Sequence, residues 1–350
     1  SWLEARRGAR LALIGHPDLR RSPEAYGLGD WETLESEPDD ELASRLSRTV
    51  SALRRSKDAW ELELMERAAA ASTAGHLTAL RRAHAGMSER LLQVELEAEF
   101  FRSGAERTAY GSIVASGPNS AVLHFAPTDR CLSDGELVLI DAGAECRGYA
   151  SDVTRTFPVK RRFEGVQRDL YALVLDVQRR AIAGVVPGKE YRELHLEAAE
   201  RVADGLVQLG LLRGDPASLV ERDVHALFFP HGLGHLLGLA THDAGGCLEG
   251  RSPSDRFGLK WLRADLPLMP GYVVTVEPGI YFIPALLEDP ELRRRFADSV
   301  DWPSVDRLAG FGGIRIEDDV LVTEGVPTVL TSEIPKSIKE IESLRSEANG

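Results

Sequence analysis

The chain has 350 residues, of which 43% are hydrophobic and 28% charged, and its formal net charge is −13. This composition is typical of a globular protein with one large domain, or a large domain and a small companion. The negative balance argues against nucleic-acid or anionic-membrane partners. The chain has no apolar run of membrane-spanning length and no signal pattern, and its three cysteines lack zinc spacing, so we expect a cytoplasmic protein with reduced thiols.

The first 56 residues look like a small separate piece. Residues 10–15 predict a short strand, and a loop punctuated by Pro and Gly runs to about Pro38. Asp39 or Asp40 is then expected to cap a helix with apolar positions at helical spacing. Two elements bury little surface alone, so this piece must pack on something larger.

From residue 57 onward, helical and strand patterns alternate. Apolar spacing predicts two helices on either side of Gly86, in which His76 and His84 are interpreted as structural. Further helices are predicted at about 163–184 and 190–209, strands at 111–117, 136–141, 152–157, 273–276 and 313–320, and a short charged helix from Pro335.

Residues 136–157 predict a hairpin that brings two aspartates together. If the turn is centred between Cys146 and Arg147, Asp141 and Asp152 lie directly opposite on one face. Two facing carboxylates repel unless they share a proton or hold a cation. Each could instead accept a backbone hydrogen bond, but a charge directly after Leu-Val-Leu-Ile is seldom buried without a partner.

Three histidines, His231, His235 and His242, lie within twelve residues of apolar, glycine-rich sequence. Gly232 and Gly234 favour an extended or turning backbone over a helix. One such histidine would more often be a core residue bonded to a backbone carbonyl. Three with this spacing favour a metal or catalytic site.

Carboxylates elsewhere supply partners for an imidazole ligand. Glu277 ends one predicted strand, and Glu317 shares a face with Arg315 in another. Four carboxylates with one imidazole make an oxygen-rich site, which suits Mn²⁺, Co²⁺ or Fe²⁺ better than structural Zn²⁺. Two such ions can acidify a bridging water, which attacks a carbonyl as hydroxide. The ligand candidates are Asp141, Asp152, His235, Glu277 and Glu317, and the histidines left for acid or electrophilic roles are His124, His231 and His242.

The motifs HGLGH at 231–235, HD at 242–243, VEPGIYF at 276–282 and GGIRIEDD at 312–319 follow the aspartate pair in order. This series resembles the pita-bread metallopeptidases, the family of methionine aminopeptidase, aminopeptidase P and prolidase, and most closely the proline-handling branch. The resemblance implies an α/β fold with a pseudo-symmetric curved antiparallel sheet and two helix pairs. It also implies a catalytic domain at 57–350 after a shortened N-terminal domain at 1–56, and a homodimer.

The resemblance assigns roles to these residues. It implies that Asp141 binds one metal, that His235 and Glu277 bind the other, and that Asp152 and Glu317 bridge both. Mn²⁺ is the expected ion, with Co²⁺, Fe²⁺ and Zn²⁺ as alternatives, and Glu277 doubles as the general base toward a metal-bridging hydroxide. By the same resemblance, the substrate is held and the tetrahedral intermediate stabilised by His124, His231 and His242. The hydroxyl of Tyr110 assists in stabilising the intermediate, and Arg315 orders the region of Glu317.

One arginine discriminates within the branch. The stretch 258–271 resembles an insertion of prolidases, and Arg263 is similar in position to the arginine that clamps the carboxylate of a dipeptide. A solvated loop residue is the alternative interpretation of Arg263. We therefore expect an Xaa-Pro dipeptidase acting on small peptides. The alternatives are aminopeptidase P, a phosphotriester hydrolase, and a metal-free peptide- or histone-binding module.

Overall fold

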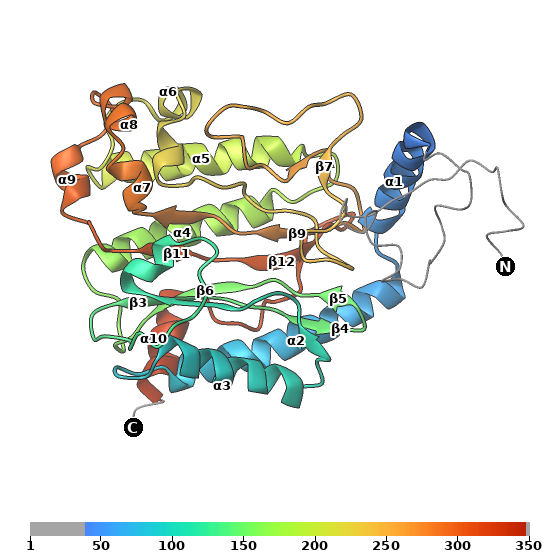
Figure 1. The fold of residues 1–350 in the computed structure, drawn as a ribbon, viewed down its shortest axis with the longest axis horizontal. Helices are drawn as coiled ribbons and strands as arrows, with labels where there is room; N and C mark the ends of the chain where they lie inside the picture. Colours follow the sequence, from blue (N-terminus) through green and yellow to red (C-terminus); the bar gives the residue numbers. More distant parts are fainter. Residues whose placement is uncertain (1–38, 348–350) are drawn as a thin grey trace, which may run out of the picture. The chain divides into compact units, whose positions relative to one another are not determined.

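A computed structural model of the protein describes residues 39–347 (Figure 1). The chain divides into two compact units, residues 1–54 and 55–350. Helix α1 (Asp40–Arg55) begins in the first unit, and Asp39 caps it by accepting a hydrogen bond from the Leu42 amide at 2.9 Å. The predicted strand at 10–15 and the loop to Pro38 lie outside the described residues. The shortened N-terminal domain stays a prediction.

The larger unit contains two pairs of long helices. In each pair the two helices pack side by side, α2 with α3 and α4 with α5 (Figure 1). No helix among residues 39–347 is long and apolar enough to cross a membrane. The long helices are α2 (Ala59–Arg82), α3 (Glu89–Arg102), α4 (Val166–Ala183) and α5 (Tyr191–Gln208), and the short ones are α6 (Pro216–Glu221), α7 (Pro284–Leu287), α8 (Pro290–Arg295), α9 (Trp302–Asp306) and α10 (Ile338–Glu347).

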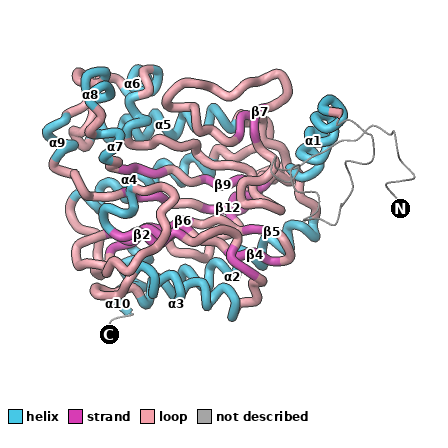
Figure 2. The backbone as a smooth tube through the Cα atoms, in the orientation of Figure 1, coloured by secondary structure: helices cyan, strands magenta, loops and turns pink. Residues whose placement is uncertain are grey.

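Small antiparallel sheets lie between the helix pairs (Figure 2). The first half of the unit supplies the order β2-β3-β6 and the second half the order β13-β12-β9. The halves meet where the Glu317 amide donates to the Thr154 carbonyl at 3.0 Å. The strands are β1 (Arg107–Thr108), β2 (Ile113–Ser116), β3 (Leu137–Asp141), β4 (Ala144–Cys146), β5 (Tyr149–Ala150), β6 (Thr154–Pro158), β7 (Gly246–Cys247), β8 (Ala264–Asp265), β9 (Val273–Val276), β10 (Gly279–Tyr281), β11 (Gly313–Arg315), β12 (Asp318–Leu321) and β13 (Thr328–Val329).

The core fills the space between helices and sheets. Helices α2 and α3 pack on β2, β4 and β5, whereas α4 packs on β9, β10 and β11. Leu92, Leu96 and Phe100 form the buried face of α3. Gly75 permits the close contact of α2 with α3, because a Cβ there would lie 2.3 Å from the Phe100 ring. The predicted α/β architecture is therefore confirmed.

His76 on α2 is a buried histidine whose Nε2 contacts the Ala142 carbonyl at 2.9 Å. Burial lowers its pKa from 6.5 to about 4. As the pH falls, the His76 ring is protonated in the unfolded chain before it is protonated in the folded protein. Its contribution to the free energy of unfolding is therefore complete above pH 6.5 and is lost as the pH falls through 4. We expect urea denaturation of metal-free protein to show this loss, and a smaller loss in His76→Gln. An unchanged pH dependence in the variant would contradict the assignment.

Candidate metal centre

The five predicted ligands come from both halves of the larger unit. Each stands at or beside the end of a strand, apart from His235, which lies in an extended segment. That segment pairs with β9, because the Thr275 amide donates to the His235 carbonyl at 2.9 Å and Leu236 bridges to Val274. The prediction that the glycine-rich segment is not helical is confirmed. The positions are Asp141 at the end of β3, Asp152 before β6, His235, Glu277 after β9, and Glu317 between β11 and β12.

Three of these side chains converge directly. One ligand atom from each of Asp152, His235 and Glu317 lies within 4.8 Å of the others, and all three residues are buried. The Nε2 of His235 is 3.3 Å from Asp152 Oδ2 and 3.6 Å from Glu277 Oε1. Its Nδ1 lies 3.0 Å from the Leu236 carbonyl and donates to it, so Nε2 is the nitrogen that faces the carboxylates. This orientation is the one that a metal-binding imidazole requires.

The predicted hairpin register is wrong by two residues. Asp141 pairs with Thr154, and Cys146 pairs with Tyr149. The turn is centred on Arg147 and Gly148, which both have positive φ (49° and 88°), as a two-residue type I′ turn demands. The turn therefore lies one residue later than predicted.

As a consequence, Asp152 lies diagonally across from Asp141 rather than directly opposite. The two side chains still share a face, because a shift of two residues keeps the alternation. Asp152 contributes to raising the pKa of Asp141, so the two carboxylates remain neighbours.

The pKa shifts of the buried carboxylates in this cluster favour the binding of a cation. Burial, with the charges of Asp152, Glu277 and Asp141, raises the pKa of Glu317 well above its usual range. Burial likewise raises the pKa of Glu277 to about 7 and that of Asp141. Burial acts against the charge of His235 as well, but Asp152 and Glu277 outweigh it and raise the pKa to about 9. Buried carboxylates with too little positive charge among them fit divalent ions, so the residues present match the group that the family pattern implies.

His231 is a half-buried member of a polar chain. Its Nδ1 is 2.8 Å from the Gly232 carbonyl and its Nε2 is 2.9 Å from the Tyr281 hydroxyl. Burial, with the charge of Arg315, lowers its pKa to about 3, so the ring is neutral. Tyr281 in turn accepts a hydrogen bond from Arg315 at 2.8 Å. Both ring nitrogens of His231 thus have a partner, one in the Gly232 carbonyl and one in the Tyr281 hydroxyl.

Arg315 ties the two halves of the site together. Its guanidinium donates to the Thr154 hydroxyl at 3.0 Å and forms an ion pair with Asp141. Thr154 then donates to Glu317 Oε2 at 2.6 Å. The hydroxyl of Tyr110 donates to Asp141 Oδ1 at 2.6 Å. Arg315 thus fixes Asp141 directly and Glu317 through one hydroxyl.

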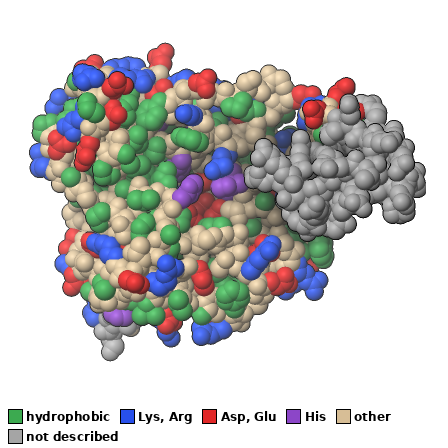
Figure 3. Space-filling model, in the orientation of Figure 1, with side chains coloured by type: hydrophobic (Ala, Val, Ile, Leu, Met, Phe, Trp, Pro, Cys, Tyr) green, Lys and Arg blue, Asp and Glu red, His purple; other side chains and the backbone are tan. Residues whose placement is uncertain are grey.

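The remaining predicted residues lie on the exposed rim. His242 stands edge-on to His235 with 4.5 Å between ring centroids. Burial, followed by the charges of His235 and Arg263, lowers the pKa of His242 to about 4. His124 is exposed and close enough for its charge to act on His242 as well. Figure 3 shows this face, with histidines around a hollow floored by carboxylates and a cationic side chain beside them.

A buried network below the site escaped the sequence analysis. Asp318 accepts from Arg155 at 2.7 Å, and both side chains are fully buried. Asp319 accepts from the Ser151 hydroxyl at 2.8 Å and from the Asp152 amide at 3.2 Å, and it therefore holds the backbone of a predicted ligand. The signal available was the acidic run after Glu317, since two further carboxylates in a buried strand need partners.

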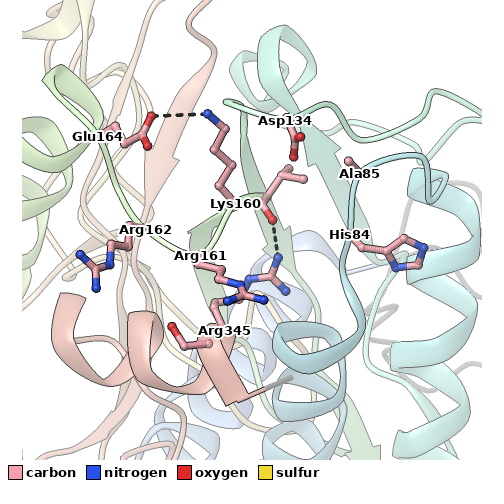
Figure 4. A pocket seen from close by; sticks show the side chains of 10 residues that line it. His84, Ala85, Asp134, Lys160, Arg161, Arg162, Glu164 and Arg345 are labelled. Atoms are coloured by element: carbon pink, nitrogen blue, oxygen red, sulfur yellow. Dashed lines mark hydrogen bonds and ion pairs between the residues drawn. The ribbon is translucent and has the colours of Figure 1, made fainter. Parts of the chain in front are cut away.

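A cavity of about 660 Å³ opens elsewhere, between the turn after α2, the β6–α4 turn and α10 (Figure 4). It contains none of the predicted ligands. Its charged lining consists of His84, Asp134, Lys160, Arg161, Arg162, Glu164 and Arg345.

Comparisons with known proteins agree with this geometry. Xaa-Pro aminopeptidase of Haemophilus influenzae is 38% identical over 328 residues, covering 93% of this chain and 69% of that protein. Xaa-Pro dipeptidase of Homo sapiens is 37% identical over 288 residues, covering 81% of this chain and 58% of that protein. The chain spans about two thirds of the length of the curated relatives it matches.

Solved structures show the same fold. Aminopeptidase PepP of Pseudomonas aeruginosa superposes with a TM-score of 0.76 at 35% identity, over 97% of this chain and 70% of that chain. Proline aminopeptidase P II of Yersinia pestis gives 0.79 at 32%, over 99% and 74%. These neighbours confirm the predicted fold. The model of metallopeptidase family M24 matches residues 63–324, and the chain therefore belongs to that family.

Proposed function

We propose that this metallopeptidase hydrolyses the Xaa-Pro bond of dipeptides that end in a free proline carboxylate. The observation that carries the proposal is the position of Arg263. It is exposed beside His242, and its guanidinium has no hydrogen bond or ion pair with any residue that the structure describes. A guanidinium binds a carboxylate through two parallel hydrogen bonds. A longer peptide has no carboxylate one residue beyond the scissile bond and forfeits this contact.

Two divalent ions, with Mn²⁺ as the expected metal, complete the proposal. Their donors would be the carboxylates and the imidazole that converge around His235. When bound, such ions supply Lewis-acid activation of water and of the peptide carbonyl. The proposed donors are Asp141, Asp152, His235, Glu277 and Glu317.

The other side chains hold and orient the peptide. Glu277, with its carboxylate 3.6 Å from His235 Nε2, takes a proton from the attacking water and returns it to the proline nitrogen. His124 and His242 on the rim donate to the carbonyl oxygen as charge develops. Tyr110 and Arg315 keep Asp141 oriented for its ligand role.

Aminopeptidase P activity is the second candidate, because a relative named Xaa-Pro aminopeptidase matches the chain as well as the dipeptidase does. In that case Arg263 would have no substrate carboxylate to bind, and longer Xaa-Pro peptides would be cleaved at least as well. The homodimer and the cytoplasmic location stay predictions.

Hydrolysis of Ala-Pro and Ala-Pro-Ala by Mn²⁺-loaded protein separates the two candidates. We expect selective cleavage of Ala-Pro, and in Arg263→Ala a KM for Ala-Pro that rises by about 10- to 100-fold, as the loss of a charged hydrogen-bonded pair predicts. The expected kcat changes little, because the clamp binds substrate and transition state alike.

Arg180→Ala serves as the control, since Arg180 is an exposed arginine of α4 paired with Asp176. It should leave both substrates unaffected. Equal or better cleavage of Ala-Pro-Ala by the unmodified protein would establish the aminopeptidase alternative instead.

A further inference from the structure

The loop that carries Arg263 is closed at its base. It spans residues 248–263 between β7 and β8, which pair in parallel so that Gly246 lies opposite Ala264. The Gly246 amide donates to the Arg263 carbonyl at 2.8 Å. The backbone of Arg263 is therefore fixed where the loop returns to the sheet.

A second set of contacts, centred on Asp223, holds the middle of this loop. Asp223 is buried and forms an ion pair with Arg256 at 2.8 Å. Arg256 also donates to the Val220 carbonyl at 3.0 Å. Two residues later, the Gly258 carbonyl lies 2.9 Å from His195 Nε2 on α5. We call Asp223, His195 and their contacts with Arg256 and Gly258 the loop seat.

The loop seat admits only glycine at position 258 without rearrangement. A Cβ there would lie 2.7 Å from Asp223 Oδ1 and 2.7 Å from His225 Nε2. His225 and Asp223 are both buried, so neither can move aside into solvent. The backbone of Gly258 is therefore lodged against the body of the protein.

Between the loop seat and the base, the chain crosses the histidine segment. A Cβ on Gly232 would lie 3.1 Å from the Trp261 carbonyl and 3.2 Å from Leu262 Cα. Gly232 is the neighbour of His231. The residues directly before Arg263 therefore rest on the segment that leads to His235, and their path is set by the loop seat at one end and β8 at the other.

We propose that the loop seat determines peptide-length specificity by positioning Arg263 over the site. Arg256 and Gly258 are positioning residues that do not touch the substrate. This inference rests on the proposed function, since it requires Arg263 to bind the carboxylate of the dipeptide. If the loop seat is loosened, residues 259–262 lift from Gly232 and the guanidinium loses its orientation, while the metal ligands stay in place.

The test is a double-mutant cycle with Arg256→Ala and Arg263→Ala, using Ala-Pro and Ala-Pro-amide as substrates. We expect Arg256→Ala to raise the KM for Ala-Pro by about tenfold and to change kcat by less than about twofold, because misplacement of a binding group weakens substrate contacts. Cleavage of Ala-Pro-amide, which lacks the carboxylate, should be unchanged. In the Arg263→Ala background, Arg256→Ala should add nothing.

Three further variants guard against a trivial loss of folding. Arg256→Lys keeps a cation for Asp223 and should restore most of the affinity for Ala-Pro. Gly258→Ala should reproduce the effect of Arg256→Ala from the other side of the loop seat. As a control, Arg293→Ala on α8 removes a more exposed ion pair with Asp306 of α9 and should alter the cleavage of neither substrate.

The outcomes are distinct. A fall in kcat for both substrates, or an additive loss in the double variant, would overturn the inference. If Arg263→Ala lowers affinity for Ala-Pro but Arg256→Ala and Gly258→Ala do not, the loop seat is irrelevant and the dipeptidase proposal survives. If Arg263→Ala itself leaves the KM unchanged, the carboxylate clamp fails and the inference fails with it.

Discussion

Replacing Glu317 with glutamine is expected to lower the rate of hydrolysis by at least about 1,000-fold. A loss of several kcal/mol of metal-assisted stabilisation of the transition state has an effect of this size. Glu317 is buried, and one of its carboxylate oxygens lies within 4.8 Å of a carboxylate oxygen of Asp152 and a ring nitrogen of His235. The amide of glutamine offers a metal ion one neutral oxygen, which is a weaker ligand than a carboxylate. Metal content after dialysis against Mn²⁺, measured by elemental analysis, should fall together with the hydrolysis of Ala-Pro.

The same substitution should leave the metal-free protein equally or more stable. The raised pKa of Glu317 shows that burial and neighbouring carboxylates oppose its charge. A group with a raised pKa favours folding at low pH, and this benefit is lost as the pH rises, so a neutral side chain is preferred at pH 7. Thr154 can still donate to the amide oxygen as it does to Glu317 at 2.6 Å. Calorimetry in the presence of a chelator should therefore show a melting temperature that is not lower.

Glu89→Gln is the matched control. Glu89 is also a buried carboxylate, but its Oε1 accepts from the Ser116 amide at 2.8 Å and from Asn119 at 2.9 Å, and its Oε2 accepts from the Thr128 hydroxyl at 2.8 Å. An amide NH₂ would face donors there, at a cost of about 1–3 kcal/mol in the free energy of unfolding. Metal content should stay normal. If both variants lost metal and activity alike, the assignment of Glu317 as a ligand would be wrong.

Asp318→Ala should lower the free energy of unfolding by about 3–5 kcal/mol, more than Glu317→Gln or Glu89→Gln. A loss of this size is typical when one partner of a buried ion pair is removed. Asp318 accepts from Arg155 at 2.7 Å, from Gln178 at 2.7 Å and from the Thr331 hydroxyl at 2.8 Å, and it also pairs with Lys336. Without it, a fully buried guanidinium keeps only carbonyl acceptors. Urea denaturation at pH 7 is the measurement.

The acid dependence gives a second check on Asp318. Burial acts against its charge, but Arg155 and Lys336 outweigh burial and lower its pKa from 3.8 to about 2. Its contribution is therefore present above pH 3.8 and is lost as the pH falls through 2, so the variant should lose less stability across that range. Asp176→Ala, which removes an exposed pair with Arg180, should change little at any pH. A similar small change for Asp318→Ala would refute the structural role.

The sequence predicts the long helices of the larger unit well, because each has a strong local pattern. The single strand predicted at 313–320 is wrong, since β11 and β12 are separate strands that belong to different sheets. The prediction also fails at the register of the 136–157 hairpin, since the pattern of alternating residues is satisfied equally by turns shifted by one residue. Gly148 could have decided the matter, because a type I′ turn accepts glycine at its second position without strain. The diagonal placement of Asp152 follows from that one residue.

The support of the site could not be predicted for a different reason. Asp318 meets Arg155 and Lys336, and Arg315 meets Tyr281, and in each case the partners come from separate elements. Local periodicity carries no information on which distant side chains meet. Tyr281 stands inside a recognised motif, yet only the fold shows that its hydroxyl connects Arg315 with His231.

The division of the candidate ligands between β3–β6 and β9–β12 has a consequence for biosynthesis. In a nascent chain Asp141 and Asp152 are added first, His235 and Glu277 follow much later, and Glu317 is the last of the five candidates. A growing polypeptide therefore offers incoming cations only a pair of aspartates until the histidine segment has been added, and an incomplete set until Glu317 follows. A prematurely terminated product that ends before Glu317 would therefore lack one of the five candidate ligands, even if all of the earlier strands had formed.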